Sequence, residues 1–484
     1  TTNIENWYKY PLQVMYSGGL MQDYGDGERH SSGLTQEHAE WFVKRTGNPY
    51  LYSYVKPYWE SGKGGYLGYL WYRDDIKPVY RETLPVSKVF EAQGIVMRSG
   101  WGDTATVIST RTGPNSNHYH YDQGSFQLMT NGDHLLTDPG IGYLGYYANL
   151  DYLIYNIQAI AHNVLLVDHD PESQTPADYD NGIAALRDWP RMIHSFAGKT
   201  ADASVADLAC VYKDKLALYN RTLLYTKTGP LFLFDQVKSS APEGHVYDWL
   251  FHAPQNENNK RSISYSGQHV LIDRPAARLT IDVVEPEIAS AVIRARDDKK
   301  YPENYIALSS KAKLPDVNFL AVLFPEAKSV AGDMAAEPKV SKLNGQGWIG
   351  ARVEHKGNMY LGFFRTQSST SANIEGFTTD ASRFTVSLTG DNIPQSLYFE
   401  GTSFKFKDLA IQSTEVITCT FNFQKNATVI ELKSDKSSSF SFSSEHKPKN
   451  IFLNGTSLRG WQYDPATKMV SLKLAEGRCE LSIN

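Results

Sequence analysis

The feature that most constrains the fold of this chain is a long succession of short runs in which apolar and polar residues alternate. The runs begin near Val89 and continue almost to the end of the 484 residues. A period of two is typical of β-strands with one buried face, and turn residues separate the runs at hairpin-like intervals. We expect strands at 94–101, 104–110, 216–225, 231–234, 245–252, 269–272, 278–284, 318–324, 348–354, 359–364, 383–388, 416–423 and 469–474. The pattern predicts a mainly β protein with antiparallel sandwiches rather than βαβ units.

The chain is long enough for two or three domains. Residues 1–85 have a helical pattern, with a capped helix expected at 35–45, a second helix at 48–58 and a glycine-rich connector at 62–68. Residues 86–395 are expected to form a large central antiparallel β-sandwich. A linker-like stretch at 391–394 precedes a smaller C-terminal β-sandwich at 396–484.

Composition excludes some classes of protein. The formal net charge is −5, so no global basic field indicates a nucleic-acid binder, and no apolar run is long enough to span a membrane. The cysteines at 210, 419 and 479 show no CxxC spacing, which disfavours a thiolate metal site. One disulfide between Cys419 and Cys479 stays open. The 12% aromatic content fits either a β-rich core or a carbohydrate-binding cleft.

A histidine-rich hairpin is the main candidate for chemistry. Residues 125–130 and 133–137 are strand-like and flank Asn131-Gly132, the pair that best suits a type I′ turn. If the preceding residues are also extended, His118 and His120 project from one face. Asp138 closes the far end of the hairpin, and His162 opens another strand-like run. These imidazoles and this carboxylate form a plausible divalent-metal site.

The residues alone leave three readings of this hairpin open: a metal site, structural hydrogen bonding and other catalytic use. Imidazoles with a carboxylate favour zinc, whereas calcium prefers oxygen ligands. The cupin barrel also carries His-x-His on a hairpin, but it expects a glutamate where this chain has Gly124 and Ser125. A cupin-like metal oxidoreductase is therefore the less favoured alternative.

Five motifs, in their order and spacing, resemble the heparinase II/III family. They are FEAQGIVMRSGW at 90–101, NHYHYDQGSF at 117–126, LLTDPG at 135–140, AHN at 161–163 and DWLFH at 248–252. Members of that family are polysaccharide lyases with an α/α-toroid, a central β-sandwich and often a smaller C-terminal β-domain. The resemblance implies that the helical segment is the end of a toroid, and that the protein is bacterial and periplasmic or secreted.

The resemblance also assigns roles to residues. His118 matches the family's catalytic histidine, and Asn117 matches the polar neighbour that faces the substrate carboxylate. His120, Asp138 and His162 match ligands of a zinc ion that holds the architecture near the active site.

Other residues are expected around the cleft. Arg111 is a candidate cation for the substrate carboxylate, and Tyr143 and Tyr146 are candidates for the cleft wall, with core packing as their alternative role. Asp122 is expected either to support the site residues from behind or to anchor the transition from strand to turn. The motif DYGDG at 23–27 either caps a helix or reaches the cleft.

The implied reaction is β-elimination on a polysaccharide that contains uronic acid. Removal of the C5 proton builds charge on the carboxylate, which requires donors or cations, and an acid must protonate the leaving oxygen. Heparin or heparan sulfate is the favoured glycosaminoglycan, with alginate next. The family's toroid normally supplies a catalytic tyrosine, so we expect this chain to be the β-half of the site, with an upstream toroid portion as its partner. A non-catalytic carbohydrate-binding or structural zinc module is the alternative.

Overall fold

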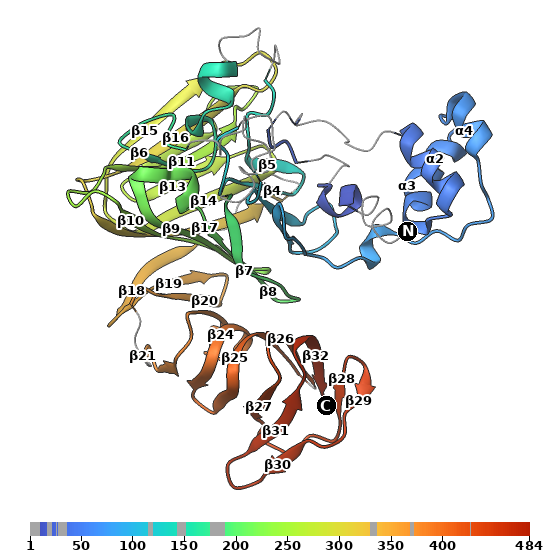
Figure 1. The fold of residues 1–484 in the computed structure, drawn as a ribbon, viewed down its shortest axis with the longest axis vertical. Coiled ribbons are helices and arrows are strands. Elements are labelled where there is room, and N and C mark those ends of the chain that lie inside the picture. Colours follow the sequence, from blue (N-terminus) through green and yellow to red (C-terminus); the bar gives the residue numbers. More distant parts are fainter. Residues whose placement is uncertain are drawn as a thin grey trace.

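The structure is a computed structural model, and it confirms the mainly β fold class (Figure 1). It describes residues 10–16, 22–25, 27, 36–114, 120–142, 152–174, 189–329, 336–367, 372–425 and 427–484. A short helical segment comes first, two packed β layers follow, and a further sheet forms the C-terminal part.

The helical segment contains α2 (Gln36–Thr46), α3 (Pro49–Glu60) and α4 (Gly65–Trp71). The first two confirm the expected helices. The third begins inside the expected connector, because close packing favours a helix there: a Cβ on Gly68 would lie 3.1 Å from Glu40 Oε1. None of the helices in the described chain is long and apolar enough to cross a membrane.

The central sandwich has one large antiparallel sheet opposite two smaller ones. The large sheet has the order β12 (Ile263–Ser266), β13 (His269–Asp273), β14 (Ala277–Glu285), β17 (Asp316–Ala327), β10 (Leu231–Ser239), β9 (Leu216–Thr226), β8 (Ala201–Asp207) and β7 (Arg191–Ala197), with the short helix α5 (Ala209–Tyr212) before β9. One facing sheet has the order β1 (Lys88–Phe90), β2 (Gly94–Arg98), β3 (Thr106–Thr110), β4 (Phe126–Thr130) and β5 (Asp133–Leu136). The other has the order β15 (Ile288–Arg296), β16 (Glu303–Ser310), β11 (Tyr247–Pro254) and β6 (Leu165–Val167).

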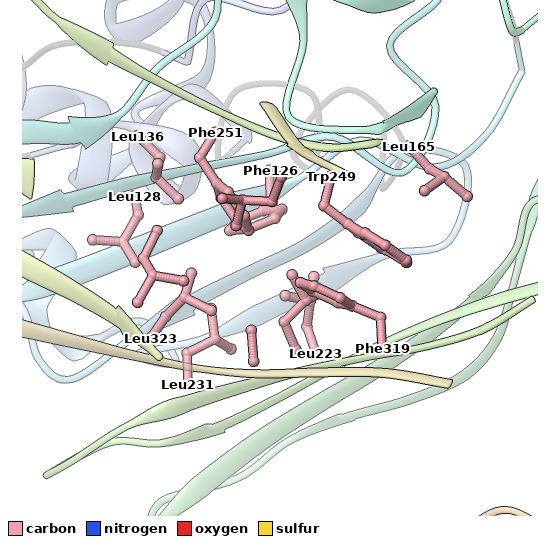
Figure 2. Close-up of a cluster of buried hydrophobic side chains, with 14 of the residues drawn as sticks. Phe126, Leu128, Leu136, Leu165, Leu223, Leu231, Trp249, Phe251, Phe319 and Leu323 are labelled. Atoms are coloured by element: carbon pink, nitrogen blue, oxygen red, sulfur yellow. The ribbon is translucent and has the colours of Figure 1, made fainter. Parts of the chain in front are cut away.

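The main core lies between these layers (Figure 2). Phe126 and Phe251 extend from the smaller sheets toward Leu231 on the large sheet. Trp249 stacks on Phe319, with ring centroids 4.2 Å apart and planes 10° apart. Burial of these large apolar side chains fixes the inward face of β4 and β11, and therefore which side chains of β11 point outward.

The central strands of the large sheet are buried on both faces. Along β10, Leu231 and Leu233 point into the main core, whereas Phe232 and Phe234 pack against side chains from the C-terminal sheet such as Phe364. The Phe234 and Phe364 rings stack with centroids 4.7 Å apart. Because both faces are buried, the first four residues of β10, LFLF, form a continuous apolar run.

The C-terminal sheet is continuous across the domain boundary expected at residue 395. Its order is β18 (Lys339–Gly345), β19 (Trp348–His355), β20 (Asn358–Arg365), β23 (Arg383–Thr389), β24 (Pro394–Phe406), β25 (Leu409–Gln424), β26 (Ala427–Ser434), β32 (Gly477–Ile483), β28 (Ile451–Leu453) and β29 (Thr456–Ser457). Off this path lie β21 (Ala372–Ile374), β22 (Phe377–Thr379), β27 (Ser438–Ser443), β30 (Gln462–Asp464) and β31 (Met469–Leu474). The expected linker is a hairpin turn between the paired strands β23 and β24, closed by the Thr389 amide donating to the Ile393 carbonyl.

The sheet register rules out the disulfide that the sequence left open. Cys419 lies opposite Leu432, and Leu432 lies opposite Cys479, so β26 separates the two cysteines. Two strand spacings are roughly 9–10 Å, beyond the ~7 Å that a disulfide can bridge between Cα atoms. All three cysteines are free thiols.

His194 on β7 gives a prediction for the pH dependence of stability. Its Nε2 lies 3.1 Å from the Tyr398 hydroxyl and 3.4 Å from Glu400 Oε2, both on β24. The charged groups that act on it are Glu400, Arg383, Lys433 and Asp435. Burial lowers the pKa of His194 to about 4, in spite of the nearby carboxylates.

Because the folded pKa is depressed, the unfolded chain binds a proton at this residue between pH 6.5 and 4 while the folded chain does not. Stability is therefore expected to fall as pH falls through that window, by up to about 3 kcal/mol. The variant His194→Gln should lose less thermal stability between pH 7 and 4.5 than the wild type. Equal losses in both proteins would contradict this role of His194.

Candidate metal centre and active site

The predicted hairpin is present, and it places Asp138. Its strands are β4 and β5, and the turn residues Asn131 and Gly132 have φ of 53° and 75°, as a type I′ turn requires. Asp138 follows the second strand after Thr137. Residues 122–125 form a turn in which the Ser125 amide donates to the Asp122 carbonyl, and strand β4 begins at Phe126. Asn117 and His118 lie outside the described residues.

Three of the predicted site residues meet. His120, Asp138 and His162 are all fully buried, and one potential ligand atom from each lies within 4.8 Å of the other two. His162 Nδ1 is 2.7 Å from Asp138 Oδ2, and the His120 and His162 ring centroids are 5.4 Å apart. The turn before β4, the end of β5 and the segment before β6 thus bring together residues that are distant in the sequence.

The cluster fits a zinc ion by its donor set. Two imidazoles and one carboxylate are common zinc ligands. His162 Nε2 is buried and has no hydrogen-bond partner among the described residues. Burial lowers the pKa of His162, but the charge and hydrogen bond of Asp138 outweigh it, so the pKa is raised. A proton and a metal ion would therefore compete for this site.

The predicted substrate contacts have different outcomes. Arg111 is buried: its Nη2 donates to the Pro114 carbonyl at 2.6 Å, and its Nε lies 3.7 Å from Asp122 Oδ1. Arg111 thus contacts residues on both sides of the stretch 115–119. Contact between Arg111 and substrate stays a prediction. Tyr143 and Tyr146 lie outside the described residues.

Through the DYGDG motif, the helical segment contacts strand β3 and the turn that follows Asp138. The Tyr24 hydroxyl donates to the Ser109 carbonyl at 2.6 Å, and the Ile141 amide donates to the Gly27 carbonyl at 3.2 Å. Asp23 is completely buried. The motif therefore packs against the turn that follows Asp138. A helix-capping role would involve residues 28–35, which lie outside the described residues.

A substitution at Gly140 tests the contact between the DYGDG motif and the turn after Asp138. Gly140 has a φ of 56°, and a Cβ there would lie 2.3 Å from the Gly27 carbonyl oxygen. Gly132 has a φ of 75° with nothing within 4 Å of its Cβ position, so it is a matched control. Both alanine variants bear about 1–2 kcal/mol of backbone strain. We expect Gly140→Ala to lower the free energy of unfolding by at least about 1 kcal/mol more than Gly132→Ala. Equal effects in urea titrations would show that the contact is loose.

Sequence reasoning missed a polar group beside the cluster. The His252 ring stacks on Tyr305, with centroids 4.9 Å apart, and its Nδ1 lies 3.6 Å from Glu303 Oε1. The Tyr155 hydroxyl donates to the same oxygen at 2.8 Å. Alternation along β11 could have indicated that His252 points away from the main core. Trp249 points into that core, and His252 is three residues further along the strand, on the opposite face.

Comparison with known proteins then places the domain. Residues 83–312 match the family described as Heparinase II/III-like, C-terminal. This part of the chain is a heparinase II/III-like C-terminal domain. The clustered residues His120, Asp138 and His162 all lie in it. No curated protein matches the sequence.

Solved structures share the fold of the heparinase-like domain and of the sheets around it. The heparan sulfate lyase HepC from Pedobacter heparinus is 16% identical, with a TM-score of 0.54 over 76% of this chain and 53% of that one. A heparinase III is 15% identical, with a TM-score of 0.52 over 80% of this chain and 52% of that one. This chain therefore spans about half the length of these proteins. At such identities the likeness shows the fold alone.

Proposed function

We propose that this chain is the β-half of a lyase that cleaves a polysaccharide containing uronic acid by β-elimination. The observation that carries the proposal is the buried cluster of His120, Asp138 and His162 inside a heparinase II/III-like domain. The similarity to a heparinase III and to a heparan sulfate lyase supports a glycosaminoglycan such as heparin or heparan sulfate as the substrate. Alginate is the next candidate.

The chemistry explains why a fixed histidine is needed. The C5 proton is weakly acidic, so the carboxylate beside it must be stabilised as charge builds up. In the proposed site, Asn117 donates to that carboxylate and His118 takes part in proton transfer. His118 is two residues from His120, so the cluster holds one end of the catalytic segment in place. Such support keeps a catalytic side chain within its productive geometry.

The proposed cofactor is a structural zinc ion held by His120, Asp138 and His162. When bound, it would supply positive charge and a cross-link between the three segments. The proton transfers belong to the side chains of the protein.

An upstream toroid portion of the same protein is the proposed partner, with a periplasmic or secreted location. The helical segment exposes aromatic side chains: Tyr66 is 76% exposed, Tyr69 is 82% exposed and Trp41 is 41% exposed. Large apolar patches of this kind usually mark a surface that packs against another element. Further toroid helices would cover it.

This partner can be tested in the protein at its full natural length. If toroid helices cover α4, Tyr69→Glu should lower the free energy of unfolding by more than about 1 kcal/mol, because a charge would be buried in a packed interface. Tyr265→Glu is the control, since Tyr265 is 47% exposed on β12. Similar small effects of both substitutions would contradict a packed surface at α4.

The lyase function is tested by the absorbance of the unsaturated uronate product. The protein at full natural length is incubated with heparin, heparan sulfate, chondroitin sulfate and alginate. We expect product from at least one uronic-acid polymer, and its loss in a folded His118→Ala variant. A folded, zinc-loaded protein that forms no product from any of them would refute the function.

A further inference from the structure

A buried arginine and its carboxylate partner lie next to the segments that carry His120 and His162. Arg221 on β9 and Asp235 on β10 are directly opposite each other in the sheet, and they are 3% and 0% exposed at the side chain. Arg221 Nε and Nη2 donate to the two carboxylate oxygens at 2.9 and 2.8 Å. Trp249 Nε1 also lies 3.1 Å from Asp235 Oδ2. The carboxylate thereby fixes the plane of the guanidinium.

The remaining nitrogen of Arg221 reaches two of the segments that carry metal-ligand candidates. Nη1 donates to the Gly124 carbonyl at 2.9 Å and to the Asn163 carbonyl at 2.8 Å. Gly124 is four residues after His120, and Asn163 immediately follows His162. One side chain therefore holds both histidine segments together.

Asn163 connects the third segment. Its Nδ2 donates to the Phe126 carbonyl at 2.8 Å and to the Thr137 carbonyl at 2.9 Å, and Thr137 immediately precedes Asp138. Its Oδ1 accepts from the His252 amide at 2.7 Å. The amide is 1% exposed, so these bonds are shielded from water.

We propose that Arg221 and Asn163 are positioning residues that set the separation of His120, Asp138 and His162 before a metal binds. This inference rests on the proposed zinc site. The two side chains tie all three ligand segments close to the ligand itself, and outer contacts of this kind set the affinity of metal sites. The unbound site then loses little conformational freedom on binding.

A substitution of a second buried arginine, Arg278, distinguishes a positioning role from a general effect on stability. Arg278 and Glu326 are also directly opposite each other on neighbouring strands of the large sheet, and they are 8% and 6% exposed. Arg278 Nε and Nη2 both donate to Glu326 Oε2. The further ion-pair partners of this pair are Glu337, His355 and Lys356, which lie toward the C-terminal sheet. Arg278→Lys is therefore a matched control for Arg221→Lys.

The experiment is a zinc titration of metal-stripped protein by calorimetry, with circular dichroism and thermal unfolding recorded without zinc. We expect Arg221→Lys to bind zinc at least about tenfold more weakly than the wild type, and Arg278→Lys to keep the wild-type affinity. Asn163→Asp retains the shape and the acceptor of the side chain but loses both donors. It should weaken zinc binding in the same way, and it decides the question if Arg221→Lys does not fold.

Wild-type zinc affinity in a folded Arg221→Lys or Asn163→Asp variant would overturn the positioning role. So would an equal loss of affinity in Arg278→Lys. A wild-type protein that binds no zinc would remove the metal site together with the positioning role. A different outcome is that the proteins show the expected zinc affinities while the wild type forms no unsaturated uronate. That outcome would refute only the lyase function.

Discussion

Replacing His162 with alanine is expected to weaken zinc binding by more than about 100-fold, since even outer contacts of a metal site are worth about 10–100-fold. His162 is fully buried, and its Nδ1 lies 2.7 Å from Asp138 Oδ2. Its loss removes one nitrogen donor and leaves a buried carboxylate without this partner. Lyase activity should fall with the metal, because His120 would no longer be held in place beside His118.

Metal content per chain and calorimetric zinc affinity measure this effect. His446→Ala is the control, because His446 is an exposed histidine of the C-terminal part. Circular dichroism shows whether the variant remains folded. A folded His162→Ala variant with wild-type zinc content would place the metal elsewhere.

Replacing Arg221 with methionine is expected to lower the free energy of unfolding by about 3–5 kcal/mol. The substitution leaves the buried Asp235 carboxyl without its cationic partner, and it removes the donor from the Gly124 and Asn163 carbonyls. Breaking one side of a buried ion pair costs far more than removing a surface pair, which is worth about 0–1 kcal/mol.

A urea titration of Arg221→Met measures the loss. The double variant Arg221→Met with Asp235→Leu should recover part of it, because no uncompensated charge then remains in the core. If the single variant loses less than about 1 kcal/mol, or if the double variant is the less stable of the two, the pair does not have this role.

Much of the fold could be predicted because its strands alternate clearly. The turn at Asn131-Gly132 was predictable from backbone chemistry alone. The strand β8 was missed because its buried residues are mostly alanine and serine, which give little hydrophobic contrast. The hairpin turn at 391–394 was interpreted as a linker because linkers and tight turns both use residues such as Asp, Asn and Pro, which occur here in DNIP.

Tertiary packing overrode local propensity in the helical segment. Residues 62–68 are rich in glycine, which favours a connector. In the structure, Gly68 lies within α4 close to Glu40, and a larger residue there would contact the carboxylate. Sequence alone does not show that this glycine serves close packing.

The cluster of His120, Asp138 and His162 could be predicted only from a combination of motifs, since the three residues are far apart in the sequence. The support beneath it was missed, although a signal existed. Arg221 lies within one expected strand and Asp235 directly follows the next, and both have the parity of the core residues on their strands. Such charges are rarely buried unless they are paired, so their parity could have indicated the ion pair.

The most direct test of the zinc site is anomalous diffraction from crystals of the purified protein, recorded above and below the zinc absorption edge. We expect one zinc peak about 2.0–2.2 Å from a nitrogen of His120, a nitrogen of His162 and an oxygen of Asp138. A zinc-supplemented crystal with no peak between these three side chains would contradict the proposed metal centre.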